Sequence, residues 1–222
     1  NIITFDAHDP RVQNAIPLHG FETVQPAYQF IKNLLRNQKD LQIDSDHMMV
    51  ISPDEADGRA IYIANVLGLD MGMFYKRRDY TKIVKDANPI VAHEFLGSDV
   101  EGKDMIVIDD MISSGESVLE WSPQLKEKKA QDFHLRYLRP LYQWLEGFDK
   151  AFADGIIDRV LTTNLIYQTP ELLERDWYIN CNMSKYVAYL IDTLNHDTSI
   201  SDLLDPNEKI QKLLGRYRSN IL

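Results

Sequence analysis

Residues 105–117 read Met105-Ile-Val-Ile-Asp-Asp-Met-Ile-Ser-Ser-Gly-Glu-Ser117, and this stretch decides the fold class. The apolar run 105–108 predicts a buried strand, which ends in the paired carboxylates Asp109 and Asp110. A turn rich in serine and glycine follows, and a helical pattern begins at about residue 118. The first N–H groups of a helix have no partner within the helix and bind anions. Carboxylates before such a turn suit ribose hydroxyls or a divalent cation, so the stretch predicts a sugar-phosphate site.

The rest of the chain alternates strand-like and helix-like segments. The predicted strands are residues 2–5, 48–51, 71–75, 105–108, 133–138, 159–163 and 177–179, with an extended pair at 89–96. The predicted helices are residues 27–35, 60–67, about 118–129, 141–153 and 184–194, with two short stretches around Pro206. This alternation predicts an α/β fold, with a mainly parallel sheet flanked by helices on both faces.

Chemically active residues follow three of the predicted strands. Asp54 comes after strand 48–51 in a Ser52-Pro-Asp54 turn, Lys76 comes after strand 71–75, and Asp109 comes after strand 105–108. Ligands of such sheets bind at the carboxyl ends of the strands. We therefore expect these three residues at one edge of the sheet.

The motifs resemble those of a known family. The stretch 105–117 is similar to the phosphoribosyl-diphosphate (PRPP) loop of the type I phosphoribosyltransferase fold. Asp6-Ala-His-Asp9, Ser52-Pro-Asp54 and Lys76-Arg-Arg78 precede it in that order. The series resembles ribose-phosphate pyrophosphokinases, in which a D-x-H segment, an S-P-D turn and a K-R-R segment precede the loop. The resemblance runs to about residue 213 and includes Val160-Leu-Thr-Thr-Asn164.

The resemblance implies Mg²⁺-dependent transfer of diphosphate from ATP to C1 of ribose 5-phosphate, which gives PRPP and AMP. It assigns the metal to His8 and Asp54, together with Asp6, which would share one face of a strand with His8. It assigns catalysis to Lys76 and to Arg78, which also binds the sugar phosphate. It further implies that residues 79–88 close over the site.

The resemblance also assigns the sugar-phosphate contacts. Asp109 and Asp110 are expected to accept hydrogen bonds from ribose hydroxyls. The 5-phosphate is expected to bind backbone N–H and hydroxyl groups of Ser113, Ser114, Gly115, Glu116 and Ser117.

The residues alone leave plainer interpretations open. His8 could be a surface histidine, Asp54 a turn residue, and residues 76–78 a solvated loop. Ser113 and Ser114, followed by Glu116, could be a helix cap. A helix cap would not explain the paired acids Asp109 and Asp110.

The resemblance divides the chain into two parts. Residues 1–20 would be the end of a mostly missing N-terminal domain, and residues 21–222 a phosphoribosyltransferase-like domain that binds ribose phosphate. Because the first residue is asparagine, we expect a fragment or a processed chain. The family's adenine contacts would lie in the missing part.

Composition limits the partners and the compartment. The 222 residues include 34 acidic and 24 basic side chains, a net charge of −10, which argues against nucleic acid or an anionic membrane as the main partner. The single cysteine, Cys181, excludes an intrachain disulfide and fits a reducing cytoplasm. No apolar run reaches membrane-spanning length, and no signal peptide opens the sequence. The expected partners are ribose 5-phosphate, ATP, PRPP and, by resemblance, further copies of the chain in a dimer or hexamer.

Two alternatives remain, and departures from the family pattern motivate the first of them. The family loop usually reads D-T-x-G-T, where this chain has Ser113-Ser-Gly-Glu-Ser117. One alternative is a catalytically silent homologue that binds sugar phosphate and regulates an active synthetase. The other is a phosphoribosyltransferase that uses PRPP, although that class has no need of the three earlier motifs.

Overall fold

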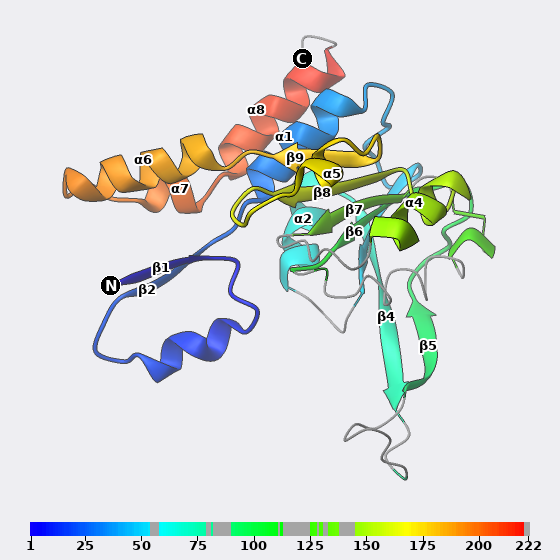
Figure 1. The fold of residues 1–222 in the computed structure, drawn as a ribbon, viewed down its shortest axis with the longest axis horizontal. Helices are drawn as coiled ribbons and strands as arrows, with labels where there is room; N and C mark the ends of the chain where they lie inside the picture. The colour runs from blue at the N-terminus through cyan, green and yellow to red at the C-terminus, as the bar shows by residue number, and fades with distance from the viewer. Residues whose placement is uncertain are drawn as a thin grey trace.

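The computed structural model describes residues 1–53, 58–78, 81, 90–110, 112, 125–127, 129–130, 133–137 and 145–219. Its main feature is a seven-stranded sheet with the strand order β5-β4-β3-β6-β7-β8-β9 (Figure 1). The strands are β3 (Met48–Ser52), β4 (Asp70–Arg78), β5 (Ile90–Leu96), β6 (Asp104–Ile108), β7 (Phe133–Tyr137), β8 (Arg159–Thr163) and β9 (Tyr178–Cys181). All neighbours pair in parallel except β4 and β5. The predicted α/β class with a mainly parallel sheet is confirmed.

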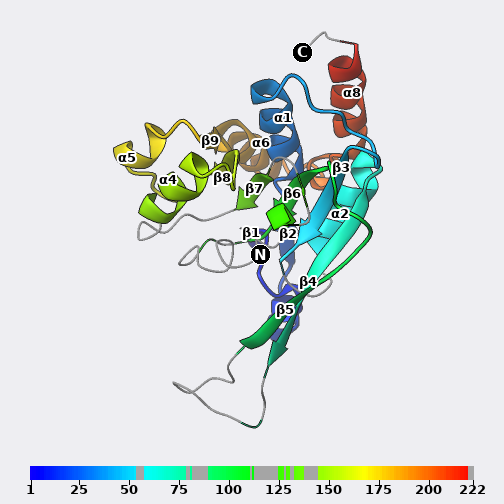
Figure 2. The same ribbon diagram turned by 90° about the vertical axis from the view of Figure 1, so that its right-hand side faces the viewer.

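Helices cover both faces of the sheet, as predicted. In β3, Met48 and Val50 belong to one core, whereas Met49 and Ile51 belong to the other, because alternate residues of a strand point to opposite faces. Helices α1 (Ala27–Asn37), α2 (Gly58–Leu67) and α8 (Asn207–Arg218) pack on the first face. Helices α4 (Leu145–Ala153) and α5 (Pro170–Leu173) pack on the second face (Figures 1 and 2).

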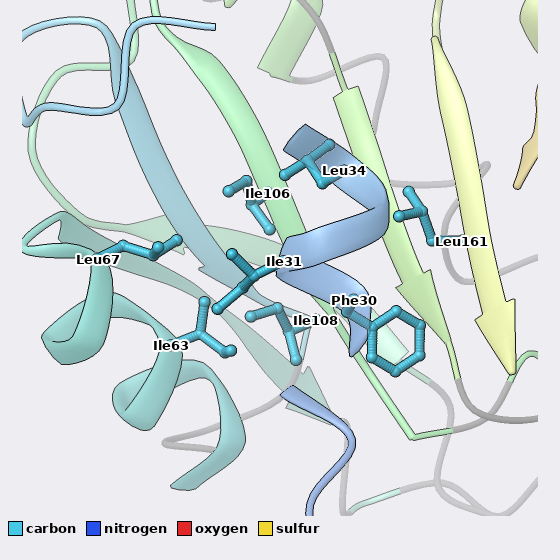
Figure 3. A pocket seen from close by; sticks show the side chains of 8 residues that line it. All are labelled: Phe30, Ile31, Leu34, Ile63, Leu67, Ile106, Ile108 and Leu161. Atoms are coloured by element: carbon cyan, nitrogen blue, oxygen red, sulfur yellow. The ribbon is translucent and has the colours of Figure 1, made fainter. Parts of the chain in front are cut away.

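The core beneath α1 contains a small cavity of about 20 Å³ (Figure 3). Its lining consists of apolar side chains from α1, α2, β6 and β8: Phe30, Ile31, Leu34, Ile63, Leu67, Ile106, Ile108 and Leu161. The space could contain about one water molecule, but a buried water needs two to four polar partners. This cavity is therefore a packing defect of the core and not a ligand site.

A separate small unit precedes the large sheet. Strand β1 (Ile2–Phe5) pairs in parallel with β2 (Phe21–Val24), and the 3₁₀ helix η1 (Pro10–Ala15) lies between them in sequence. Figure 1 shows these elements apart from the seven-stranded sheet. Strand β1 was predicted, whereas β2 and η1 were not. The predicted domain boundary at residue 20 falls between the two paired strands, and the division at that point stays a prediction.

Strand β4 is longer than predicted. It continues to Arg78, and Lys76 lies opposite His93 of the antiparallel β5. The prediction that the strand ends at residue 75 was wrong, because backbone pairing with β5 allows the polar residues to remain extended. The extended segment predicted at 89–96 is confirmed as β5. The two strands project together from the body of the molecule (Figure 2). Of the predicted closing loop 79–88, only Thr81 lies within the described residues.

The remaining helices follow the predicted pattern where they are described. Helix α6 (Ser184–Asn195) and the short α7 (Ser201–Leu204) precede α8, which buries Ile210, Leu213 and Leu214. The predicted helix 118–129 falls largely outside the described residues, although residues 125–127 are helical. In the part of the chain that the structure describes, no helix is both long enough and apolar enough to cross a membrane.

Candidate functional site

Strand β1 ends at Phe5, so the Asp6–His8 segment begins just outside the strand. Asp6 has a φ of +50°, in the left-handed region that aspartate tolerates better than most residues. Its N–H donates to the Val24 carbonyl at 3.0 Å, and the Ala7 N–H donates to Thr23 Oγ1 at 3.1 Å. The expectation that Asp6 and His8 share one face of a strand was therefore wrong. Both residues lie after β1, which ends at Phe5.

His8 contacts the carboxylate pair at the end of β6. Its Nδ1 atom lies 2.5 Å from Oδ2 of Asp110. The backbone N–H of Asp110 donates to Oδ1 of Asp109 at 2.8 Å. The side chain of Asp110 is 12% exposed, whereas that of His8 is 84% exposed. Two of the predicted site motifs, the D-x-H segment and the D-D pair, thus meet in the folded chain.

The contact shifts the protonation of both partners. The hydrogen bond and the negative charge of Asp110 raise the pKa of His8 above 6.5. Burial raises the pKa of Asp110, but the hydrogen bonds to His8 and Asp109 and the charge of Arg59 outweigh it, so this pKa falls below 3.8. The pair is therefore an ionised carboxylate beside an imidazole that gains a proton readily.

Arg59 joins the same site from the first turn of α2. Its Nε donates to Oδ1 of Asp6 at 2.5 Å. Its Nη2 donates to the carbonyl oxygens of Ala7, at 3.0 Å, and His8, at 3.3 Å. The same Nη2 lies 3.7 Å from Oδ2 of Asp110. The arginine and Asp6 side chains are only 11% and 4% exposed, so this is a buried ion pair.

Sequence reasoning missed Arg59, although a signal was present. A cation in the first turn of a helix is unfavourable, because the helix dipole is positive there. The predicted helix began at residue 60 and excluded Arg59, whereas α2 begins at Gly58. A predicted start two residues earlier, at Gly58, would have marked this cation as needing an acidic partner.

The sheet brings the ends of three strands to one edge. β3 pairs in parallel with both β4 and β6, so their carboxyl ends point the same way. Ser52 at the end of β3 is level with Met73, and β4 then continues through Lys76 to Arg78. A strand rises about 3.3 Å per residue, so Lys76 lies about 10 Å further along β4 than Met73. Asp54 and residues 113–117 lie outside the described residues.

The described residues fit a metal that takes few protein ligands. Among them, no group of three or more His, Cys, Asp or Glu side chains could bind a metal. Mg²⁺ commonly binds one or two carboxylates, and water and substrate phosphate complete its shell. A histidine whose Nδ1 binds a carboxylate presents Nε2 to a metal, and His8 has that arrangement. The exposed His8 suits one ligand position of such a site.

Comparisons with known proteins find similarity to ribose-phosphate pyrophosphokinases. No protein-family model matches the chain. The chain is 27% identical over 202 residues to a ribose-phosphate pyrophosphokinase from Shewanella oneidensis, covering 90% of this chain and 59% of that protein. It is also 27% identical over 215 residues to ribose-phosphate pyrophosphokinase 5 from Schizosaccharomyces pombe, covering 94% of this chain and 56% of that protein. The resemblance deduced from the motifs is confirmed.

A solved structure shares the fold. The phosphoribosylpyrophosphate synthetase from Mycobacterium smegmatis matches with a TM-score of 0.62 and 20% sequence identity, covering 88% of this chain and 58% of that chain. The phosphoribosyltransferase-like fold is thereby confirmed. The chain spans between 56% and 59% of the length of these three relatives.

Proposed function

We propose that the chain carries the ribose-phosphate half of a Mg²⁺-dependent ribose-phosphate diphosphokinase. The reaction would transfer diphosphate from ATP to C1 of ribose 5-phosphate and yield PRPP and AMP. The observation that carries the proposal is the contact between His8 and Asp110 at the carboxyl end of β6. It joins a segment expected to bind metal to a segment expected to bind ribose, and the similarity to ribose-phosphate pyrophosphokinases supports both assignments.

The sugar would bind at the end of β6. Asp109 and Asp110 are acceptors for ribose hydroxyls, and residues 113–117 would supply N–H and hydroxyl donors to the 5-phosphate. Because the pKa of Asp110 is lowered, this carboxylate stays ionised near neutral pH. Charge-assisted hydrogen bonds to the hydroxyls are stronger than bonds to a neutral acceptor. The site would therefore fix the orientation of the C1 hydroxyl.

The transfer itself needs positive charge where negative charge develops. The C1 hydroxyl oxygen attacks the β-phosphorus of ATP, the bond from this phosphorus to the oxygen that bridges to the α-phosphorus breaks, and AMP leaves. The hydroxyl proton passes to solvent. Lys76 and Arg78 at the end of β4 would stabilise the oxygens of the transferring group. No covalent intermediate with the chain is required.

Mg²⁺, when bound, would neutralise phosphate charge and align the two substrates. His8 and Asp54 would hold it, with Asp6 assigned to the same task by the resemblance. Binding through few protein ligands makes the metal site dependent on the substrate phosphates. Mg²⁺ affinity should therefore rise when ATP is present.

Turnover tests this function directly. The full-length protein is incubated with ribose 5-phosphate, ATP and Mg²⁺, and AMP and PRPP are followed by chromatography, with a parallel sample that lacks ribose 5-phosphate. Equal amounts of AMP and PRPP, dependent on the sugar, support the proposal. Sugar binding without AMP would instead favour the silent regulatory homologue. Consumption of PRPP with a nucleobase would favour a phosphoribosyltransferase.

A further inference from the structure

We infer that Arg59 is a positioning residue which, fixed by Asp6, holds His8 against Asp110. The consequence for turnover rests on the proposed function, but the geometry does not. Arg59 contacts both members of the pair: its Nη2 binds the His8 carbonyl at 3.3 Å and lies 3.7 Å from Oδ2 of Asp110. The same Oδ2 atom binds the His8 imidazole.

The guanidinium geometry explains why arginine is needed. The Nε and Nη2 atoms lie on one edge of the planar group and donate in a fixed fork. Here Nε binds Asp6, while Nη2 binds the carbonyl oxygens of Ala7 and His8. These two carbonyls belong to the peptide units on either side of the His8 Cα atom. Arg59 thus fixes the backbone that carries the imidazole, and the single ammonium group of a lysine would not reproduce this fork.

Asp6 completes the arrangement from the other side. Its side chain is 4% exposed, and its carboxylate binds the guanidinium at 2.5 Å. A buried charge needs a partner, and the guanidinium of Arg59 is one such partner for the Asp6 carboxylate. The ion pair therefore assigns Asp6 to the fixation of Arg59. This role for Asp6 differs from the one that the motif resemblance implies.

The first test compares Arg59→Ala and Arg59→Lys with the matched control Arg175→Ala. Arg175 also pairs with a carboxylate, Asp149 at 2.9 Å, and donates to a backbone carbonyl, but it lies between α5 and β9. Loss of a residue that orients a metal ligand typically lowers activity about 10- to 100-fold. We expect that loss in kcat for both Arg59 variants, with KM for ribose 5-phosphate changed less than about threefold. Arg175→Ala should keep kcat.

Chemical rescue separates positioning from general destabilisation. Added guanidinium ion at low millimolar concentration should restore part of the kcat of Arg59→Ala and none of any activity lost by Arg175→Ala. A kcat in Arg59→Lys equal to that of wild type would overturn the inference. So would a failure of guanidinium to restore Arg59→Ala when Arg175→Ala loses as much kcat as Arg59→Ala.

A spectroscopic test does not depend on turnover. With ¹⁵N-labelled histidine at one fixed pH, the hydrogen-bonded Nδ1 signal of His8 should be present in wild type and Arg175→Ala and lost in Arg59→Ala. This outcome in a chain without diphosphokinase activity would uphold the positioning role and reject the proposed function. An unchanged His8 signal in Arg59→Ala would reject the positioning role.

Asp6→Asn distinguishes fixation of Arg59 from metal binding. Asparagine also tolerates left-handed backbone, so the substitution removes the charge and keeps the turn. If Asp6 fixes Arg59, Asp6→Asn should weaken the His8 Nδ1 signal in the absence of metal. A higher Mg²⁺ requirement with an unchanged His8 signal would identify Asp6 as a metal ligand and overturn the inference.

Discussion

The Nδ1 atom of His8 lies 2.5 Å from Oδ2 of Asp110, although 102 residues separate them in sequence. The contact brings the turn after β1 to the carboxyl end of β6. It places a potential metal-binding imidazole beside carboxylates suited to ribose hydroxyls. The small N-terminal unit therefore contributes the His8 side chain to the candidate site at the edge of the large sheet.

The His8–Asp110 pair should make stability depend on pH. The pKa of His8 is raised in the folded chain by Asp110, with a smaller contribution from Asp109 and opposition from Arg59 and burial. The pair's contribution is therefore fully present below the ordinary histidine pKa of 6.5 and is lost as pH rises through the raised value. Because His8 is largely exposed, the contribution is at most about 1 kcal/mol.

Urea unfolding of wild type and His8→Ala without metal measures this contribution. The difference between their free energies of unfolding should be larger at about pH 5.5 than at about pH 8.5. A difference that is equal at both values, or larger at the higher one, would contradict the assigned ion pair.

Lys76→Ala should remove catalysis and retain sugar binding. Loss of one group that stabilises developing charge typically costs about 10²- to 10³-fold in kcat. AMP release measures kcat, and ribose 5-phosphate binding is measured by calorimetry. Arg77→Ala is the control, because the resemblance assigns roles only to the first and third residues of this segment. Equal losses in the two variants would show that the site responds to general positive charge.

Asp109→Asn should weaken binding of ribose 5-phosphate. A hydrogen bond to a charged group contributes about 1.5–3 kcal/mol, so the expected loss in affinity is about 10- to 100-fold by calorimetry. Asp99→Asn is the control, since the Asp99 carboxylate also accepts a backbone N–H, from Glu101 at 3.1 Å. Asp99 precedes β6 in the chain, whereas Asp109 follows it. Unchanged affinity in Asp109→Asn would exclude that carboxylate from the sugar site.

Ile31→Ala should destabilise the core without changing ligand specificity. Ile31 is 4% exposed and lines the cavity beneath α1, so truncation enlarges an existing void (Figure 3). Such changes typically cost about 2–5 kcal/mol. Ile191→Ala on α6 is the control, because Ile191 is 62% exposed and should change stability by less than about 0.5 kcal/mol. Chemical unfolding measures the change in the free energy of unfolding for each variant. Similar changes in the two variants would contradict the assigned core.

The buried strands could be predicted because their side chains carry a strong local signal. Strand β3 is buried at all its positions, and its apolar run marks it without knowledge of its neighbours. Strand β2 is different: its sequence, Phe-Glu-Thr-Val, is half exposed and is stabilised by pairing with β1. The extension of β4 through Lys76 depends on β5 in the same way. Such pairing is tertiary and leaves little trace in a short segment.

The candidate site was predicted by residue type but not by arrangement. The motifs identified His8 and Asp110 as site residues, and the structure brings them together. They did not identify Arg59, because a single arginine at a helix start has no motif of its own. Its importance follows from the left-handed turn at Asp6, which directs the carboxylate toward α2. Backbone conformation of that kind is not encoded in residue spacing.

The fate of the β-phosphorus of ATP tests the central claim most directly. The full-length protein is incubated with ATP labelled at the β-phosphorus, ribose 5-phosphate and Mg²⁺, and the labelled products are separated. Lys76→Ala is purified in parallel to exclude a contaminating enzyme. We predict that the label appears in PRPP, in the diphosphate group attached at C1, in an amount equal to the AMP released. With Lys76→Ala we predict no labelled PRPP. Label confined to ATP, ADP or free phosphate would contradict the proposed diphosphokinase activity.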